Sequence, residues 1–192
     1  AYFGEEGYGR PILGPAENVK NFTRQNLVDY IAERYNPENL VISFAGNIDV
    51  NYAAELVEKY FESVLLKRKF ADRKKPLSLA HKSLFKTKDI EQAHIAFAYP
   101  SLAREDELMD AALVVNAVLG GGMSSRLFQK VREQMGLAYT VYSYISSFTE
   151  GGLLTVYAGV NPSNVAKAQE AIEAVIADFC KNKLTQDELA RG

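Results

Sequence analysis

Three consecutive glycines in the middle of the chain, Gly120, Gly121 and Gly122, constrain its fold most because they separate two apolar segments. A glycine inside a helix costs about 1 kcal/mol relative to alanine, so a helix cannot continue through all three. Ser124 or Ser125, directly after them, can accept a hydrogen bond from a free backbone N–H group and begin a new helix. The triplet therefore predicts the end of one helix, a loop and the start of another.

The new helix is predicted to end in a turn that leads into a strand. Its apolar face has the helical spacing and holds Leu127, Phe128, Val131 and Met135. Gly136 can adopt the left-handed conformation that ends many helices. From Ala138 the pattern changes to a period of two, which is the period of a strand. One face of this strand would hold Tyr139, Val141, Ser143 and Ile145, and the other Thr140, Tyr142 and Tyr144.

Arg132 and Tyr139 are the two polar residues of this stretch that have a candidate role. They lie on either side of the predicted chain reversal at Gly136, so both can reach one point in space. A guanidinium and a phenol directed at the same point donate hydrogen bonds that suit a peptide carbonyl or an oxyanion. The spacing alone favours a plainer interpretation, a surface arginine and a half-buried strand tyrosine.

Residues 119–128, Leu-Gly-Gly-Gly-Met-Ser-Ser-Arg-Leu-Phe, and the following residues 131–139, Val-Arg-Glu-Gln-Met-Gly-Leu-Ala-Tyr, form one long motif. It closely resembles the C-terminal half-domain motif of the pitrilysin/insulinase zinc peptidases, the inverzincins, and within them the processing-peptidase-like branch. The resemblance implies that Arg132 and Tyr139 hold the substrate backbone across a cleft from the zinc. It also implies that zinc is bound by an H-x-x-E-H motif that would precede Ala1, so no zinc ligand is expected in this chain.

The resemblance implies that the parent protein is a zinc-dependent metalloendopeptidase. This chain would be its C-terminal portion, which supplies Arg132 and Tyr139 for substrate orientation and oxyanion stabilisation to a zinc site in the missing N-terminal half. By itself the chain is expected to be inactive. Its partners would be a peptide or unfolded protein substrate, the N-terminal half and a second subunit in a homo- or heterodimer. The alternative is a non-catalytic partner subunit of a two-chain peptidase, and a stand-alone binding module is favoured least.

The predicted fold is α+β, with two α/β-roll-type units of mixed, largely antiparallel sheets backed by helices. Residues 1–66 would form the C-terminal part of the first unit, which is incomplete, and residues 84–192 most of a second. The basic run that precedes Pro76 predicts a linker over residues 67–83, because domain boundaries favour exposed polar segments. A nucleic-acid patch is the other interpretation of this run, but no second basic patch accompanies it.

Local signals predict the elements of both units. Helices are expected from the caps Thr23 and Asp49, from Asp106 or Glu107 to Leu119, after Asn161 and after Thr185, and the stripe Leu27, Val28, Ile31 and Tyr35 is expected to be buried. Strands are expected over residues 39–46, 84–87 and 92–99, and a hairpin is expected to join the strand from Ala138 to residues 153–158.

Composition narrows the classes of function. A net charge of -2 gives no reason to expect a nucleic acid or an anionic membrane as partner, and no apolar run approaches the length of a membrane span. The single cysteine, Cys180, excludes an internal disulfide, fits a cytoplasmic location and is expected to be buried. The two histidines, His81 and His94, have no glutamate at ligand spacing, so neither is expected to bind a metal.

The glycine triplet could also be taken for a phosphate-binding loop. The Lys-Ser/Thr pair that completes such a loop is absent after Gly122. We therefore expect Gly120, Gly121 and Gly122 to form a flexible loop, or to let the backbone approach a neighbour closely.

Overall fold

The computed structural model describes residues 2–4, 7–35, 40–62 and 83–191. The chain divides into two compact units, a smaller one formed by Glu5–Lys74 and a larger one formed by Lys75–Gly192 together with Ala1–Gly4. Most of the predicted linker, and His81, lie outside the described residues. None of the described helices combines the length and the apolar character that crossing a membrane requires.

The smaller unit contains a short 3-10 helix, η1 (Gly7–Gly9), and three α-helices, α1 (Ala16–Asn21), α2 (Arg24–Arg34) and α3 (Val50–Phe61). Both predicted caps are confirmed. The Thr23 hydroxyl accepts a hydrogen bond from the Asn26 N–H, and Asp49 Oδ1 accepts one from the Tyr52 N–H at 3.0 Å. These caps are local interactions, which explains why the sequence alone predicts them.

The strand predicted over residues 39–46 is wrong for its described part, because residues 40–46 are irregular. A strand needs a neighbour to take up its backbone hydrogen bonds, and the described residues of this unit form no other strand. The apolar stripe of α2 is not buried either, since Leu27 and Ile31 are 56% and 52% exposed. The described residues of this unit form no sheet on which the stripe of α2 could pack.

The larger unit is built on a three-stranded antiparallel sheet that consists of β1 (Ala93–Ser101), β2 (Ala138–Ser147) and β3 (Gly152–Val160). Strand β3 lies between the other two, so the predicted β2–β3 hairpin is confirmed. The strand predicted over residues 84–87 does not form. The helices of this unit are α4 (Met109–Gly120), η4 (Phe128–Gln134), η5 (Pro162–Asn164), α5 (Val165–Asn182) and α6 (Gln186–Arg191).

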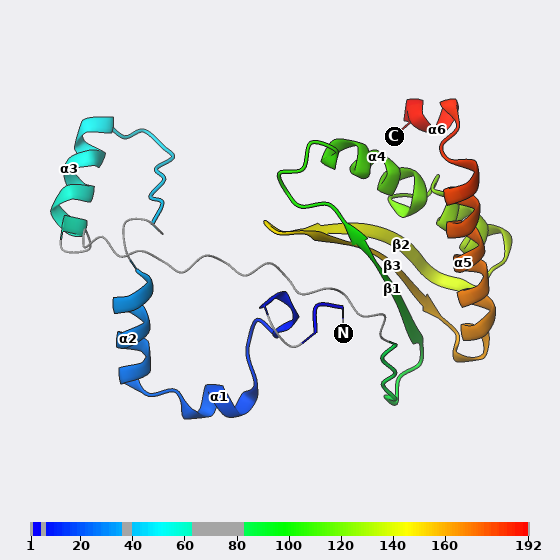
Figure 1. Cartoon of the computed structure of the whole chain (residues 1–192), viewed down its shortest axis with the longest axis horizontal. Coiled ribbons are helices and arrows are strands. Elements are labelled where there is room, and N and C mark those ends of the chain that lie inside the picture. The colour runs from blue at the N-terminus through cyan, green and yellow to red at the C-terminus, as the bar shows by residue number, and fades with distance from the viewer. Residues whose placement is uncertain (1, 5–6, 36–39, 63–82, 192) are drawn as a thin grey trace. The chain divides into compact units, whose positions relative to one another are not determined.

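Helices α4 and α5 lie on the same face of this sheet (Figure 1), and the core of the unit lies between them and the strands. Fully buried members of the core come from each layer, namely Leu127, Val131, Val156, Ala158, Val160, Ala168 and Ile172. Burial of one large aliphatic side chain contributes about 1.5–3 kcal/mol, so this layer of contacts holds the helices on the sheet. The predicted α+β class with an antiparallel sheet is confirmed.

The alternation in β1 is confirmed as well. Ile95 and Phe97 pack against the core, while His94 is exposed on the opposite face.

The prediction that Cys180 is buried is wrong, because its thiol is exposed. The buried face of α5 runs through Ile172 and Val175 to Phe179, and the next residue along the helix turns away from that face.

Residues 2–4 belong to the larger unit because Phe3 contacts the end of the hairpin. The ring of Phe3 lies 5.7 Å from that of Phe148 in an edge-to-face arrangement, a favoured geometry for aromatic pairs.

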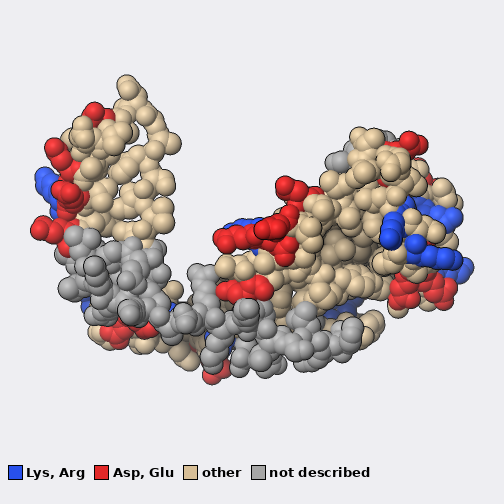
Figure 2. Space-filling model, turned by 45° about the horizontal axis from the view of Figure 1, so that its top comes forward, with Lys and Arg blue, Asp and Glu red and all other residues tan. Residues whose placement is uncertain are grey.

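Elsewhere on this unit, Lys and Arg side chains gather at the α5 end in the view of Figure 2.

Candidate functional site

The segment that carries Arg132 is a π-helix, η4, where an α-helix was expected. Before it, the buried Ser125 accepts a hydrogen bond from the Phe128 N–H through its hydroxyl, as the predicted cap requires. At the other end, the Met135 N–H donates to the Lys130 carbonyl five residues earlier, at 3.1 Å. π-Helical turns are rare and are frequent at functional sites, so this segment is a candidate.

The turn that follows η4 has the predicted left-handed glycine. Gly136 has a φ of 60°, and its N–H donates to the Arg132 carbonyl at 3.1 Å. The bond from Gly136 to Arg132 is that of an αL helix end, and the Leu137 N–H makes a further bond to the Val131 carbonyl, six residues earlier, at 3.0 Å. The backbone of Arg132 is therefore tied directly to the turn that leads into β2.

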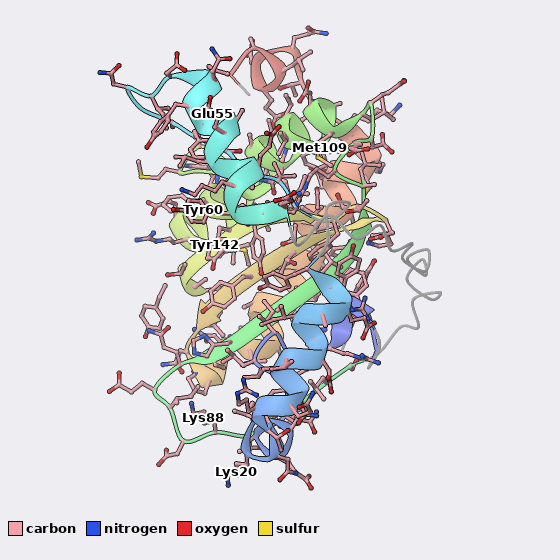
Figure 3. The ribbon with its side chains drawn as sticks, turned by 90° about the vertical axis from the view of Figure 1, so that its left-hand side faces the viewer. Lys20, Glu55, Tyr60, Lys88, Met109 and Tyr142 are labelled. Carbon is pink, nitrogen blue, oxygen red and sulfur yellow. The ribbon has the colours of Figure 1, made fainter. Side chains whose placement is uncertain are left out.

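Tyr139 does not lie on the strand face that strict alternation assigned to it. Ala138 pairs with Val160 and Thr140 pairs with Gly159, which leaves Tyr139 as the extra residue of a β-bulge. Val141 is 4% exposed on the core face, whereas Tyr139 is 56% exposed. The strand register and its exposure thus place Tyr139 off the core face, on the side of β2 that carries Tyr142, the residue labelled in Figure 3.

Arg132 is exposed on the last turn of η4. Its guanidinium lies over the ring of Phe128, 4.7 Å from the centroid, and its Nε is 4.0 Å from Oε1 of Glu133. An exposed pair at that distance contributes little, so the guanidinium keeps its capacity to donate. Neither Arg132 nor Tyr139 makes a side-chain hydrogen bond to another described residue. Two accessible donors therefore flank the Gly136 turn.

The three glycines before η4 have different surroundings. Gly120 is buried at the end of α4, and a Cβ added there would lie 2.4 Å from the Ser143 N and 2.5 Å from its Oγ. The hydroxyl of Ser143 donates to Asn116 Oδ1 at 2.8 Å across the same contact. Gly120 therefore lets α4 lie directly against β2, while a Cβ on Gly122 would meet no atom within 4 Å. A flexible loop over Gly121 and Gly122 stays a prediction.

The sequence interpretation missed Arg126, which fastens the start of η4 to two other helices. Its Nε donates to Glu188 Oε1 and its Nη2 to Glu188 Oε2, both at 2.7 Å. Nη1 contacts Asp178 Oδ2 at 3.2 Å, and the guanidinium lies 4.8 Å from the centroid of the Phe179 ring. The sequence motif that pointed to Glu188 was the Thr185–Glu188 capping box, which forms as predicted. A capping box is a local motif, so it does not indicate that an arginine distant in the sequence binds the same glutamate.

The contacts of this cluster perturb the carboxyl of Glu188. The hydrogen bonds from Arg126, followed by those from the Thr185 backbone and hydroxyl, lower the pKa of Glu188 from 4.5 to about 2. The same contact with Glu188 raises the pKa of the Arg126 guanidinium. This pair is a structural anchor for η4, and it leaves no free group with which to act on a substrate.

The donor set of the described residues does not fit a zinc ion. Of the two histidines, His94 lies among the described residues. Its Nδ1 lies 2.6 Å from the Tyr157 hydroxyl. Within the described ranges, no three His, Cys, Asp or Glu side chains gather where they could hold a metal. A structural zinc site takes four such ligands and a catalytic one three, so these residues cannot supply either.

Comparison with known proteins gives consistent results. Residues 21–192 match the family described as the peptidase M16 inactive domain. The chain is 40% identical over 189 residues to the uncharacterized zinc protease YmxG of Bacillus subtilis, covering 98% of this chain and 46% of that protein. It is also 40% identical over 197 residues to an uncharacterized zinc protease of Streptomyces coelicolor, covering 99% of this chain and 43% of the relative. The chain therefore spans just under half the length of these relatives.

Solved structures show the same relationship. The crystal structure of a peptidase M16 inactive domain from Pseudomonas fluorescens superposes with a TM-score of 0.82 at 25% identity, covering 99% of this chain and 46% of that one. A protease from Helicobacter pylori has the same fold, with a TM-score of 0.75 at 22% identity over 93% of this chain and 44% of its own. The predicted resemblance to the pitrilysin/insulinase-type peptidases is confirmed, and the chain belongs to the peptidase M16 inactive-domain family.

Proposed function

We propose that this chain is the C-terminal portion of a zinc-dependent metalloendopeptidase, in which Arg132 and Tyr139 orient the substrate backbone and stabilise the oxyanion. The observation that carries the proposal is the pair of accessible donors on either side of the Gly136 turn, neither of which makes a side-chain hydrogen bond to another described residue, within a chain of this family. The relatives named as zinc proteases, each more than twice as long as this chain, support it.

The two side chains suit different tasks. The Tyr139 hydroxyl donates one hydrogen bond, and a donor aimed at a developing oxyanion contributes more in the transition state than in the ground state. The Arg132 guanidinium donates several hydrogen bonds in one plane, which suits the carbonyl groups of an extended substrate backbone. The helix end at Gly136 and the bulge at Tyr139 fix the two backbone positions, so little ordering is needed when substrate binds.

We place the zinc ligands in the N-terminal half that the family resemblance implies, and the donors among the described residues of this chain do not fit zinc. When bound there, it would supply Lewis-acid chemistry and an activated water. This chain contributes binding, orientation and hydrogen bonding to that reaction.

The test is peptide hydrolysis by the full-length protein, measured together with its zinc content before and after chelation. We expect hydrolysis that chelation abolishes and zinc restores, and no hydrolysis by the 192-residue chain alone. A full-length protein that neither holds zinc nor cleaves peptides, but activates a zinc-bearing subunit, would instead support the non-catalytic partner. Hydrolysis that survives removal of the metal would overturn both.

A further inference from the structure

Among the described residues of the larger unit, the helices α4 and α5 cover one face of the sheet and no helix covers the other. The core lies on the covered face. The strand register places His94 of β1 opposite Gly159, Tyr142 of β2 opposite Tyr157, and Tyr144 of β2 opposite Thr155. These residues share the open face, on which Tyr142 and Tyr144 are 40% and 43% exposed.

Aromatic rings join across the strands on this face. The rings of Tyr142 and Tyr157 lie 5.0 Å apart between centroids, those of Tyr142 and Tyr144 lie 5.9 Å apart, and His94 stacks on Tyr157 at 5.9 Å. The 2.6 Å contact between His94 Nδ1 and the Tyr157 hydroxyl holds the last pair. We call His94, Tyr142, Tyr144 and Tyr157 the tyrosine face. It is one continuous aromatic surface drawn from all three strands.

The open face also lacks charged side chains. The residues of β1, β2 and β3 that share it are of the types Ala, Gly, Leu, Pro, Ser, Thr, Tyr and His, without Asp, Glu, Lys or Arg. Ala96, which pairs with Tyr157, projects only a methyl group beside the ring. Charged residues make up 24% of the whole chain, whereas this strand face has no Asp, Glu, Lys or Arg. Such a face favours partners that are uncharged where they touch it. It disfavours a partner that would bury an unpaired charge.

Tyr139 connects this face to the proposed site, because the bulge brings it to the same side of β2. Each regular strand residue advances about 3.3 Å and the bulge shortens the first step, so Tyr142 and Tyr144 lie at most roughly 10 and 17 Å along β2 from Tyr139. An extended peptide with one carbonyl at Tyr139 would therefore place side chains three to five residues away over the tyrosine face.

We propose that the tyrosine face is a specificity site for uncharged aromatic or large aliphatic side chains of an extended polypeptide substrate, several residues from the bond held at Tyr139. This inference rests on the proposed function. Its evidence is the match between an aromatic surface without Asp, Glu, Lys or Arg and uncharged aromatic side chains, and the position of that surface along the strand that carries Tyr139.

Binding of fluorescently labelled, unstructured peptides to the 192-residue chain, followed by anisotropy, tests the site without requiring catalysis. The peptides differ only at spaced positions that hold Phe and Leu, Glu, or Lys. We expect the Phe/Leu peptide to bind at least about tenfold more tightly than either charged peptide. Tyr142→Ala and Tyr144→Ala should each weaken it about 3- to 10-fold, the usual range for one aromatic contact.

Three further variants control this result. Tyr142→Phe keeps the ring and should keep the affinity, which also covers the case in which Tyr142→Ala does not fold. Leu113→Ala removes an exposed apolar side chain from α4, on the other side of the sheet, and should change nothing. Ala96→Lys places an ammonium beside Tyr157 and should reverse the preference towards the Glu peptide.

Equal binding of all three peptides, or unchanged affinity in the well-folded Tyr142 and Tyr144 variants, would overturn the inference. Self-association of the chain that Tyr142→Ala abolishes would also overturn it, because the face would then bind a second copy. If the full-length protein cleaves no peptide while the preference persists, only the proposed function fails. If it cleaves peptides without this preference, only the specificity site fails.

Discussion

Arg126 and Glu188 form a two-point ion pair in which Nε–Oε1 and Nη2–Oε2 are both 2.7 Å, and it joins residues on either side of α5 in the sequence. Both side chains are less than one fifth exposed. Hydrogen bonds between charged groups contribute more than neutral ones, and a partly buried pair is screened less than a surface pair. The pair therefore fixes the C-terminal helix α6 to the start of η4, the helix that carries Arg132.

We expect Glu188→Gln to lower the free energy of unfolding by about 1–3 kcal/mol, the range for losing a charged hydrogen-bond partner. Urea unfolding of both proteins at neutral pH measures this change in the free energy of unfolding. Glu170→Gln is the matched control, since Glu170 is exposed on α5. A loss no greater than that of the control would show that the pair contributes nothing.

The same pair predicts a dependence on pH. The folded pKa of Glu188, about 2, lies below its ordinary value of 4.5, so its stabilisation is complete above that value and is lost as the pH falls from 4.5 towards 2. Unfolding measured across this range should show the wild type losing more stability than Glu188→Gln. Parallel curves for the two proteins would contradict the assignment.

Gly120→Ala should destabilise the larger unit by about 1–3 kcal/mol or more, because the new methyl would overlap the backbone of Ser143 and overpacked contacts cost that much. The gain in helix propensity, about 1 kcal/mol, is too small to compensate. Gly122→Ala, with open space around its Cβ, should leave the melting temperature nearly unchanged. Similar melting temperatures for the two variants would refute the close contact between α4 and β2.

Tyr139→Phe in the full-length protein should lower kcat about 100- to 1000-fold with a smaller change in KM, because one oxyanion donor is removed. The exposed hydroxyl has no other described partner, so zinc content and melting temperature should not change. Tyr52→Phe removes a hydroxyl from a tyrosine that is 57% exposed, close to the 56% of Tyr139, and should have normal kinetics. Near-normal activity of Tyr139→Phe would return Tyr139 to the role of a plain surface residue.

Arg132→Ala should raise KM and lower kcat together, because it removes a multidentate donor that acts on bound substrate as well as on the transition state. Arg132→Lys keeps the charge but loses the planar array of donors, so it should restore only part of the activity. Steady-state kinetics on one peptide separates these effects. Full rescue by lysine would mean that the positive charge alone is needed at this position.

Limited trypsin digestion tests the predicted linker over residues 67–83. The basic run there offers many cleavage sites, and an exposed linker is cut before folded units are. The first cuts should fall between Lys67 and Lys75 and release two fragments. First cuts inside α4 or β2, with this run intact, would argue against a linker.

The amino-acid sequence by itself determined the features that depend on neighbours within a few residues. The caps at Thr23 and Asp49, the Thr185–Glu188 box and the left-handed Gly136 each arise from a side chain or glycine and the adjacent backbone. The alternation of β1 and the long motif that identifies the family are likewise visible in the order of residues. Helix ends and strand periods are local, so their signals survive without knowledge of the fold.

Tertiary structure decided the rest, because contacts between distant residues leave no local pattern. The register of β2 on β3 made Tyr139 a bulge residue and moved it off the strand face that alternation had it share with Val141. The approach of α4 to Ser143 gave Gly120 its role, and the fold brought Arg126 to a carboxylate 62 residues away. The α2 stripe stays exposed for the converse reason: an apolar face is buried only where another layer packs on it, and periodicity does not say whether that layer is present.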